Sequence, residues 1–211
     1  MIIKMFCKPK IQERFHSIIM LCLLLIFLIP IGGINPTSGL RWQGDYEEIR
    51  TQALFYARSY GITGESEIIK RAFDYSVRFG MRWDVVVRWI QSESSFIPSA
   101  TSRVDAKGLT QLMDGTADYI GKILLHSGMI GLTQEEEENL RNSEYSLYGI
   151  ENNLLIGFSY LKFLILCSEN PEEALARYLA GKRWIEFIDS RYVRHIADGK
   201  PIICESVLQY Y

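Results

Sequence analysis

The sequence contains little histidine and cysteine, the residues that most often build zinc sites. Its three histidines stand at positions 16, 126 and 195, and neither a His-Glu-x-x-His nor a Cys-x-x-Cys spacing occurs. We therefore expect no metal site and no cofactor. Beyond the N-terminal region the cysteines are Cys167 and Cys204, which either pair in an oxidising compartment or remain buried thiols.

Other sequence motifs typical of catalytic or binding sites are missing as well. No Gly-rich phosphate loop is present, and Gly157, Ser159 and Leu161 depart from the Gly-x-Ser-x-Gly elbow of serine hydrolases at its last position. Basic residues are not in excess: the chain has 23 Lys and Arg against 25 Asp and Glu, and four of the basic residues but one acidic residue lie within residues 1–33. The remainder is mildly acidic, which disfavours a nucleic acid as partner.

The chain also lacks an apolar run of about 18 residues, the length of a comfortable membrane span. Its longest run, 18–31, is broken by Pro30, follows a basic stretch and precedes two glycines, which is the build of an export signal. No clean small-x-small cleavage site follows, so a cleaved signal peptide and an uncleaved membrane anchor over residues 1–33 both remain open. Either would place the remainder in the periplasm or cell envelope, with residues 15–33 carrying any association with the inner membrane.

Helical periodicity dominates the remainder, without the alternation typical of strands. We expect helices over 45–60, 66–79, 83–96, 116–126, 152–166, 171–181 and 185–196. The most apolar of them, 152–166, is predicted to be a central buried helix, whereas the acidic run Glu135–Glu138 is expected on a solvated surface. These patterns predict one all-α domain over 66–200, after a linker with a helical extension (34–65) and before a tail (201–211).

One carboxylate lies on an apolar helical stripe. Glu93 stands at i+7 from Val86, i+4 from Trp89 and i+3 from Ile90, so its side chain points towards the interior. Loss of hydration would raise its pKa and let it hold a proton near neutral pH, as a general acid must. The alternative is a structural glutamate that snorkels or caps the helix end, because Pro98 stops the helix soon afterwards.

A long ungapped motif surrounds Glu93, and shorter motifs follow it in order. The first reads Glu93-Ser94-x-Phe96-x-Pro98-x-Ala100-x-Ser102, then Ala106-x-Gly108-Leu109-x-Gln111-Leu112-Met113 and Thr116-Ala117. The later ones are Asn153-Leu154-x-x-Gly157-x-x-Tyr160-Leu161, Ala176-Arg177-Tyr178-Leu179-Ala180-Gly181 and Tyr192-Val193-x-x-Ile196. Together, over roughly residues 66–196, they resemble the catalytic domain of the soluble lytic transglycosylases (SLT). The resemblance implies a lysozyme-like (goose-type/SLT) single helical domain with a substrate groove.

The resemblance also implies an activity and a set of site residues. Glu93 matches the family's single catalytic acid and base, Tyr178 the tyrosine beside it, and Gln111 a residue of the sugar groove; Ser94 and Ser102 are further expected substrate contacts. The implied substrate is the peptidoglycan glycan strand, cleaved at the MurNAc-β-1,4-GlcNAc bond without water to leave 1,6-anhydroMurNAc ends. No cofactor is implied, and the oligomeric state stays unknown. The alternative for Tyr178 is a half-buried core tyrosine.

Four positions depart from the family pattern. Asp105 replaces the usual Gly, Thr110 and Asp114 replace the frequent Met and Pro, and Leu179 replaces an Asn. They leave two alternatives open. One is a hydrolytic goose-type lysozyme-like muramidase in which Asp105 positions a water. The other is a non-catalytic peptidoglycan-binding module that has lost turnover through Leu179.

Overall fold

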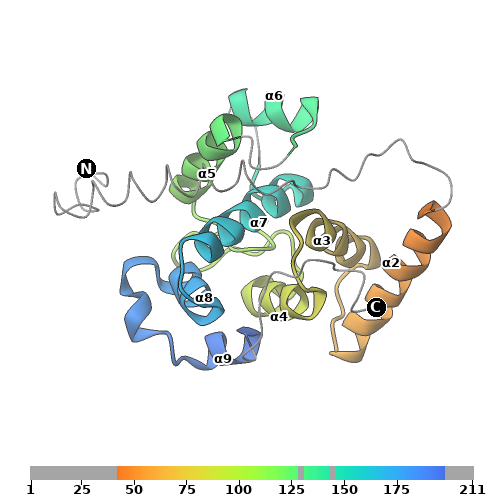
Figure 1. Ribbon diagram of the computed structural model, residues 1–211, viewed down its shortest axis with the longest axis horizontal. Coiled ribbons are helices and arrows are strands. Elements are labelled where there is room, and N and C mark those ends of the chain that lie inside the picture. The colour runs from red at the N-terminus through yellow and green to blue at the C-terminus, as the bar shows by residue number, and fades with distance from the viewer. Residues whose placement is uncertain (1–41, 128–130, 143–145, 198–211) are drawn as a thin grey trace. The chain divides into compact units, whose positions relative to one another are not determined.

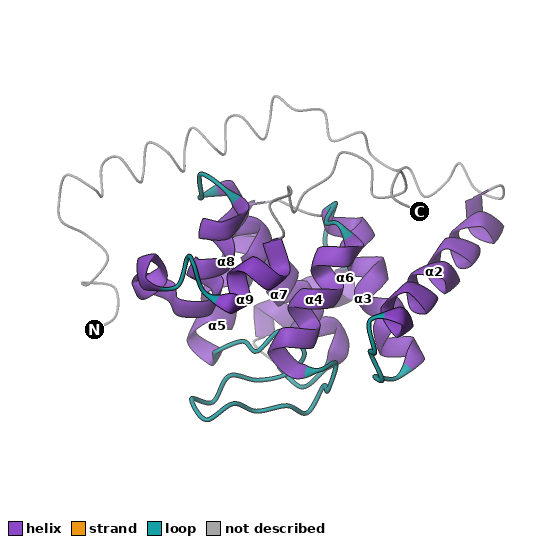
Figure 2. Ribbon diagram, turned by 90° about the horizontal axis from the view of Figure 1, so that it is seen from below, coloured by secondary structure: helices purple, strands orange, loops and turns teal. Residues whose placement is uncertain are grey.

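A computed structural model describes residues 42–127, 131–142 and 146–197, and this part of the chain is helical (Figure 1). The helices are α2 (Trp42–Ser59), α3 (Ser66–Phe79), α4 (Trp83–Ser94), α5 (Asp114–Ser127), α6 (Gln134–Asn142), α7 (Ile150–Leu166), α8 (Pro171–Ala180), the 3-10 helix η2 (Gly181–Glu186) and α9 (Arg191–Ala197). Within these ranges there is no strand, which confirms the all-α prediction (Figure 2). The predicted signal or anchor (1–33), the tail (201–211) and Cys204 lie outside the described residues.

The predicted central helix is α7, and 9 of its 17 residues are buried. It packs against α3, α5 and α8. Phe158, near its middle, contacts the rings of Tyr75, Phe79 and Trp89, and so joins α7 to α3 and to α4. None of the described helices is long and apolar enough to cross a membrane.

Two predicted helix ends follow the local chemistry of the sequence. Helix α3 ends where Gly80 takes φ 64, and the amide of Met81 donates to the carbonyl of Ser76. Helix α8 begins with Pro171 in its first turn, and the side chain of Asn170 caps it by accepting a hydrogen bond from the amide of Glu173.

Two other predicted boundaries were wrong. Helix α4 ends at Ser94 rather than 96, because Ser95 and Phe96 take positive φ values of 54 and 59, and the turn carries Phe96 into the core. The expected continuous helix 185–196 is split into η2 and α9. The hydroxyl of Ser190 accepts a hydrogen bond from the amide of Val193 and so caps a new helix start.

A long loop, residues 95–113, joins α4 to α5 and is shown in teal in Figure 2. It folds back on itself through isolated bridges that pair Lys107 with both Thr101 and Leu112. Because the loop starts directly after Glu93 and Ser94, its conformation determines what surrounds the carboxylate.

Candidate active site

Glu93 lies in the last turn of α4 with its side chain largely withdrawn from water. Burial raises the pKa of its carboxyl to about 7, and a hydrogen bond from Tyr192 partly offsets that rise. Trp89 and Ile90, its neighbours on the same helix face, are fully buried. The raised pKa agrees with the prediction made from helix position, and it leaves a large protonated fraction near neutral pH.

The direct partner of Glu93 is Tyr192, which α9 carries. The Tyr192 hydroxyl donates to Oε1 of Glu93, and α9 packs against α4. Burial and the charge of Glu93 raise the pKa of Tyr192 well above its ordinary value, so the phenol keeps its proton and remains a donor. Sequence reasoning did not select Tyr192 as a site residue, although the closing Tyr-Val-x-x-Ile motif contained it.

Tyr178 lies close to the carboxyl but is not its hydrogen-bond partner. Its hydroxyl donates to the carbonyl of Thr110 at 2.6 Å, instead of to Glu93. Its ring meets Trp89 edge-on with centroids 5.2 Å apart and lies 5.1 Å from the ring of Tyr160. Burial first, and the charge of Glu93 second, raise the pKa of Tyr178 well above its ordinary value. Tyr178 therefore connects the loop after Glu93 to α8. The charge of Glu93 also acts on the pKa of this phenol.

The other three expected site residues hold the loop together. The hydroxyl of Ser94 donates to the carbonyl of Leu109 at 2.8 Å. Nε2 of Gln111 donates to the carbonyl of Gly108 at 2.8 Å, and the hydroxyl of Ser102 accepts from the amide of Ala106 at 3.0 Å. These bonds fix the backbone beside Glu93, and the predicted contacts of the three side chains with substrate stay predictions.

A buried amide attaches the loop to α7. Nδ2 of Asn153 donates to the carbonyls of Lys107 (3.0 Å) and Leu147 (2.8 Å), and its Oδ1 accepts from the amide and the hydroxyl of Thr110, both at 2.8 Å. Every hydrogen-bonding position of this side chain is thus used. The packing between α7 and the loop is so tight here that a Cβ built on Gly157 would lie 2.2 Å from Oγ1 of Thr110.

Asp105 lies at the tip of the loop. It takes φ 64, a conformation that glycine adopts freely and aspartate tolerates, which explains how Asp can stand where Gly is usual. Its carboxylate is exposed and lies 3.4 Å from Nζ of Lys107. It is not among the groups that shift the pKa of Glu93.

The sequence model of the transglycosylase SLT domain family matches residues 72–192, more than half of the chain. The chain belongs to this family. No curated protein and no solved structure matches it. The match places this SLT domain in the lysozyme-like superfamily and indicates glycan-cleaving transglycosylase activity on peptidoglycan. It spans Glu93 and Tyr178 and ends at Tyr192.

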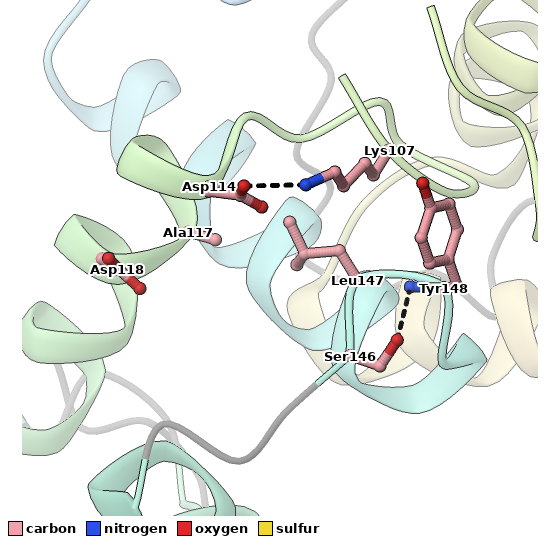
Figure 3. A pocket seen from close by; sticks show the side chains of 7 residues that line it. All are labelled: Lys107, Asp114, Ala117, Asp118, Ser146, Leu147 and Tyr148. Atoms are coloured by element: carbon pink, nitrogen blue, oxygen red, sulfur yellow. Dashed lines mark hydrogen bonds and ion pairs between the residues drawn. The ribbon is translucent and has the colours of Figure 1, made fainter. Parts of the chain in front are cut away.

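A pocket of about 280 Å³ lies on another part of the SLT domain (Figure 3). It is lined by Lys107, Asp114, Ala117, Asp118, Ser146, Leu147 and Tyr148. The ammonium of Lys107 reaches across it to the carboxylate of Asp114 at 2.7 Å. Glu93 does not line this pocket, so the chemistry of the carboxyl has to be sought at the junction of α4, α8 and α9. Among the described residues, no group of His, Cys, Asp and Glu could hold a metal ion.

Proposed function

We propose that this SLT domain is a lytic transglycosylase that cleaves the MurNAc-β-1,4-GlcNAc bond of peptidoglycan and leaves 1,6-anhydroMurNAc ends. The observation that carries the proposal is the Glu93 carboxyl, with a pKa of about 7 and one phenol, Tyr192, as its hydrogen-bond donor. In the proposed mechanism Glu93 acts first as acid and then as base.

In the first step, protonated Glu93 gives its proton to the glycosidic oxygen while the bond from that oxygen to C1 of MurNAc breaks. The leaving GlcNAc then departs with a neutral hydroxyl group. The acetamido group of MurNAc stabilises the positive charge at C1, so the substrate supplies the group that a second carboxylate supplies in most glycosidases. A pKa of about 7 suits this step, because the acid is both present and able to release its proton.

In the second step, ionised Glu93 accepts the proton of the muramoyl 6-hydroxyl while O6 forms a bond to C1. The 1,6-anhydro ring closes, and Glu93 is protonated again and ready for the next cycle. Tyr192 favours the proton release of the first step, because its hydrogen bond to the ionised carboxylate is stronger than one to the neutral acid, and it holds that carboxylate in place for the second step. No water molecule is consumed.

The geometry favours this pathway over hydrolysis by a goose-type lysozyme-like site. Hydrolysis with inversion requires a second carboxylate placed to activate water. In the described residues, burial and Tyr192 account for the pKa of Glu93, with no contribution from another carboxylate. Asp105, the residue considered for that role, pairs with Lys107 at the exposed loop tip.

We further propose that the domain works in the cell envelope, exported or anchored through residues 1–33. That proposal rests on the basic and apolar pattern of the sequence.

The experiment is a digest of purified peptidoglycan by the full chain, with the released fragments analysed by mass spectrometry. Anhydro ends, lighter by one water than reducing ends, are the expected product, and Glu93→Gln should release none. Reducing ends would point to the muramidase instead. Binding to peptidoglycan with no release by the unmutated protein would point to a non-catalytic module.

A further inference from the structure

The Tyr192 hydroxyl, which contacts Glu93, belongs to α9, a helix too short to be stable on its own. Helix α9 has 7 residues, well below the length at which an isolated helix is stable in water. Val193 and Ile196 bury its apolar side fully, which sets its depth in the core. Apolar contacts are less directional than hydrogen bonds, so a polar contact further along α9 would fix its rotation, and with it the direction of the Tyr192 hydroxyl, more closely.

Arg88 makes a directional contact with α9. Its Nη2 donates to the backbone carbonyl of Ile196 at 3.1 Å and lies 3.2 Å from Oδ2 of Asp84. The side chain of Arg88 is 11% exposed, so water competes weakly for these bonds. The carbonyl belongs to the last turn of α9, where carbonyl groups lack partners within the helix and a cation is favoured.

This contact and the Tyr192 contact join the same two helices at separate points. Along α4, Glu93 follows Arg88 by five residues, about 7.5 Å of helix rise. Along α9, Tyr192 precedes Ile196 by four residues, about 6 Å of rise. The helices therefore run in opposite directions at this contact, and their two hydrogen bonds are separated by similar lengths on both.

We propose that Arg88 is a positioning residue, which holds the end of α9 on α4 and thereby aims the Tyr192 hydroxyl at Glu93. Its importance for turnover rests on the proposed function of Glu93. The positioning itself does not, because it is a property of the protein without substrate.

The consequence is a change in how Glu93 titrates. The Tyr192 hydrogen bond stabilises the ionised carboxylate, so a displaced Tyr192 raises the pKa of Glu93 above its value of about 7. In the part of the chain that the structure describes, the titratable groups that face Glu93 are Tyr192 from α9 and Tyr178 from α8, and burial keeps both phenols neutral. Removing Arg88 changes the charge of neither group.

The decisive variant is Arg88→Met, which keeps most of the aliphatic stem and loses the donors. We expect a carbon NMR titration of the Glu93 carboxyl in full-length protein to show a raised pKa. Peptidoglycan release should fall by roughly tenfold in kcat with little change in KM. In a Tyr192→Phe background the same substitution should leave the pKa of Glu93 unmoved, because the bond that Arg88 aims is already gone.

Two further variants keep the test interpretable. Arg78→Met removes an arginine of α3 that binds Glu136 and the carbonyl of Gly131, away from α9, and should leave the Glu93 titration unchanged. Arg88→Lys retains a single donor and should shift the titration in the same direction but less, and it carries the test if Arg88→Met does not fold.

An unchanged Glu93 titration in folded Arg88 variants would overturn the proposal, as would an equal pKa rise from Arg88→Met with and without the Tyr192 hydroxyl. The NMR titration needs no substrate. A wild-type protein inactive on peptidoglycan would therefore refute the proposed function and leave this inference to be judged on its own.

Discussion

The hydroxyl of Tyr192 donates a hydrogen bond to Oε1 of Glu93 across a sequence separation of 99 residues. Burial pushes the pKa of Glu93 up, and this bond pulls it down; the balance lies at about 7. One side chain can then serve as both acid and base near neutral pH, because neither of its forms is strongly disfavoured.

Among the described residues, Tyr192 alone lowers that pKa, and replacing it with Phe removes its hydrogen bond. We expect the pKa of Glu93 to rise, since desolvation remains and the stabilisation of the carboxylate is lost. The alkaline limb of the kcat/KM profile, where the acid loses its proton, should move to higher pH, and kcat should fall by roughly tenfold to a hundredfold. A pH–rate series on solubilised glycan strands measures both effects.

Tyr178→Phe is the matched control. Its hydroxyl donates to the Thr110 carbonyl, so its loss should cost about 1–2 kcal/mol of stability and leave the alkaline limb in place. If instead Tyr178→Phe moved the limb and Tyr192→Phe did not, the assignment of the two phenols would be reversed.

Glu93 should destabilise the folded protein at the pH where it works. Its pKa is about 7 in the folded state against 4.5 for an exposed glutamate side chain, so the folded state binds the proton more tightly. Below about pH 4.5 both states are protonated and nothing is lost; stability then falls as pH rises to about 7 and stays low above it.

Glu93→Gln should therefore be more stable than wild type by about 2–3 kcal/mol at pH 8, and nearly equal to it at pH 4. The amide oxygen can still accept from Tyr192, so the comparison isolates the charge. Chemical denaturation at the two pH values provides the measurement. An equal stability difference between Glu93→Gln and wild type at both pH values would mean that Glu93 is not buried as described.

Asp105 should be dispensable. Because it holds φ 64 in an exposed position, Asp105→Gly should be neutral or slightly stabilising, whereas Asp105→Val should cost about 1–2 kcal/mol. Loss of the exposed pairing with Lys107 adds little. Thermal unfolding checks the stability, and product analysis should show the same anhydro ends for Asp105→Gly. Reducing ends that the unmutated protein releases and Asp105→Gly does not would instead assign Asp105 the positioning of a water molecule.

The contact between α7 and the loop should tolerate no added methyl group. Gly157→Ala places a Cβ 2.2 Å from Oγ1 of Thr110, which Asn153 holds in place, so we expect a loss of about 1–3 kcal/mol and lower activity. Gly115→Ala, in α5, meets nothing within 4 Å and should be neutral or stabilising by up to about 1 kcal/mol. Equal unfolding midpoints for the two variants would contradict this packing.

The sequence was enough to predict that Glu93 faces the core, but not that Tyr192 is its hydrogen-bond partner. Spacing from Trp89 and Ile90 predicts that Glu93 faces the core, because one helix fixes all three positions. The direction of a hydroxyl from another helix depends on where that helix starts. Ser190 begins α9 by capping it, and a continuous helix through this residue would have turned Tyr192 differently.

The same limit explains the other missed features. Ile185 fits the apolar periodicity of one continuous helix running to residue 196. It lies instead in η2, which ends before α9 begins, and its side chain is 70% exposed. Asp105 stands out in the sequence as a departure from the family pattern, but its positive φ is visible only in the folded loop. Periodicity reports which side of an element is apolar, and it carries no information on how two elements meet.

In the proposed mechanism Glu93 transfers protons in both directions while the 6-hydroxyl of the substrate, and not water, attacks C1. Digestion of peptidoglycan in water enriched in heavy oxygen, followed by mass spectrometry of the new glycan ends, tests it most directly. We expect anhydro ends without heavy oxygen, and no new ends from Glu93→Gln. Heavy oxygen at C1 of newly formed reducing ends, or undiminished release by Glu93→Gln, would contradict it.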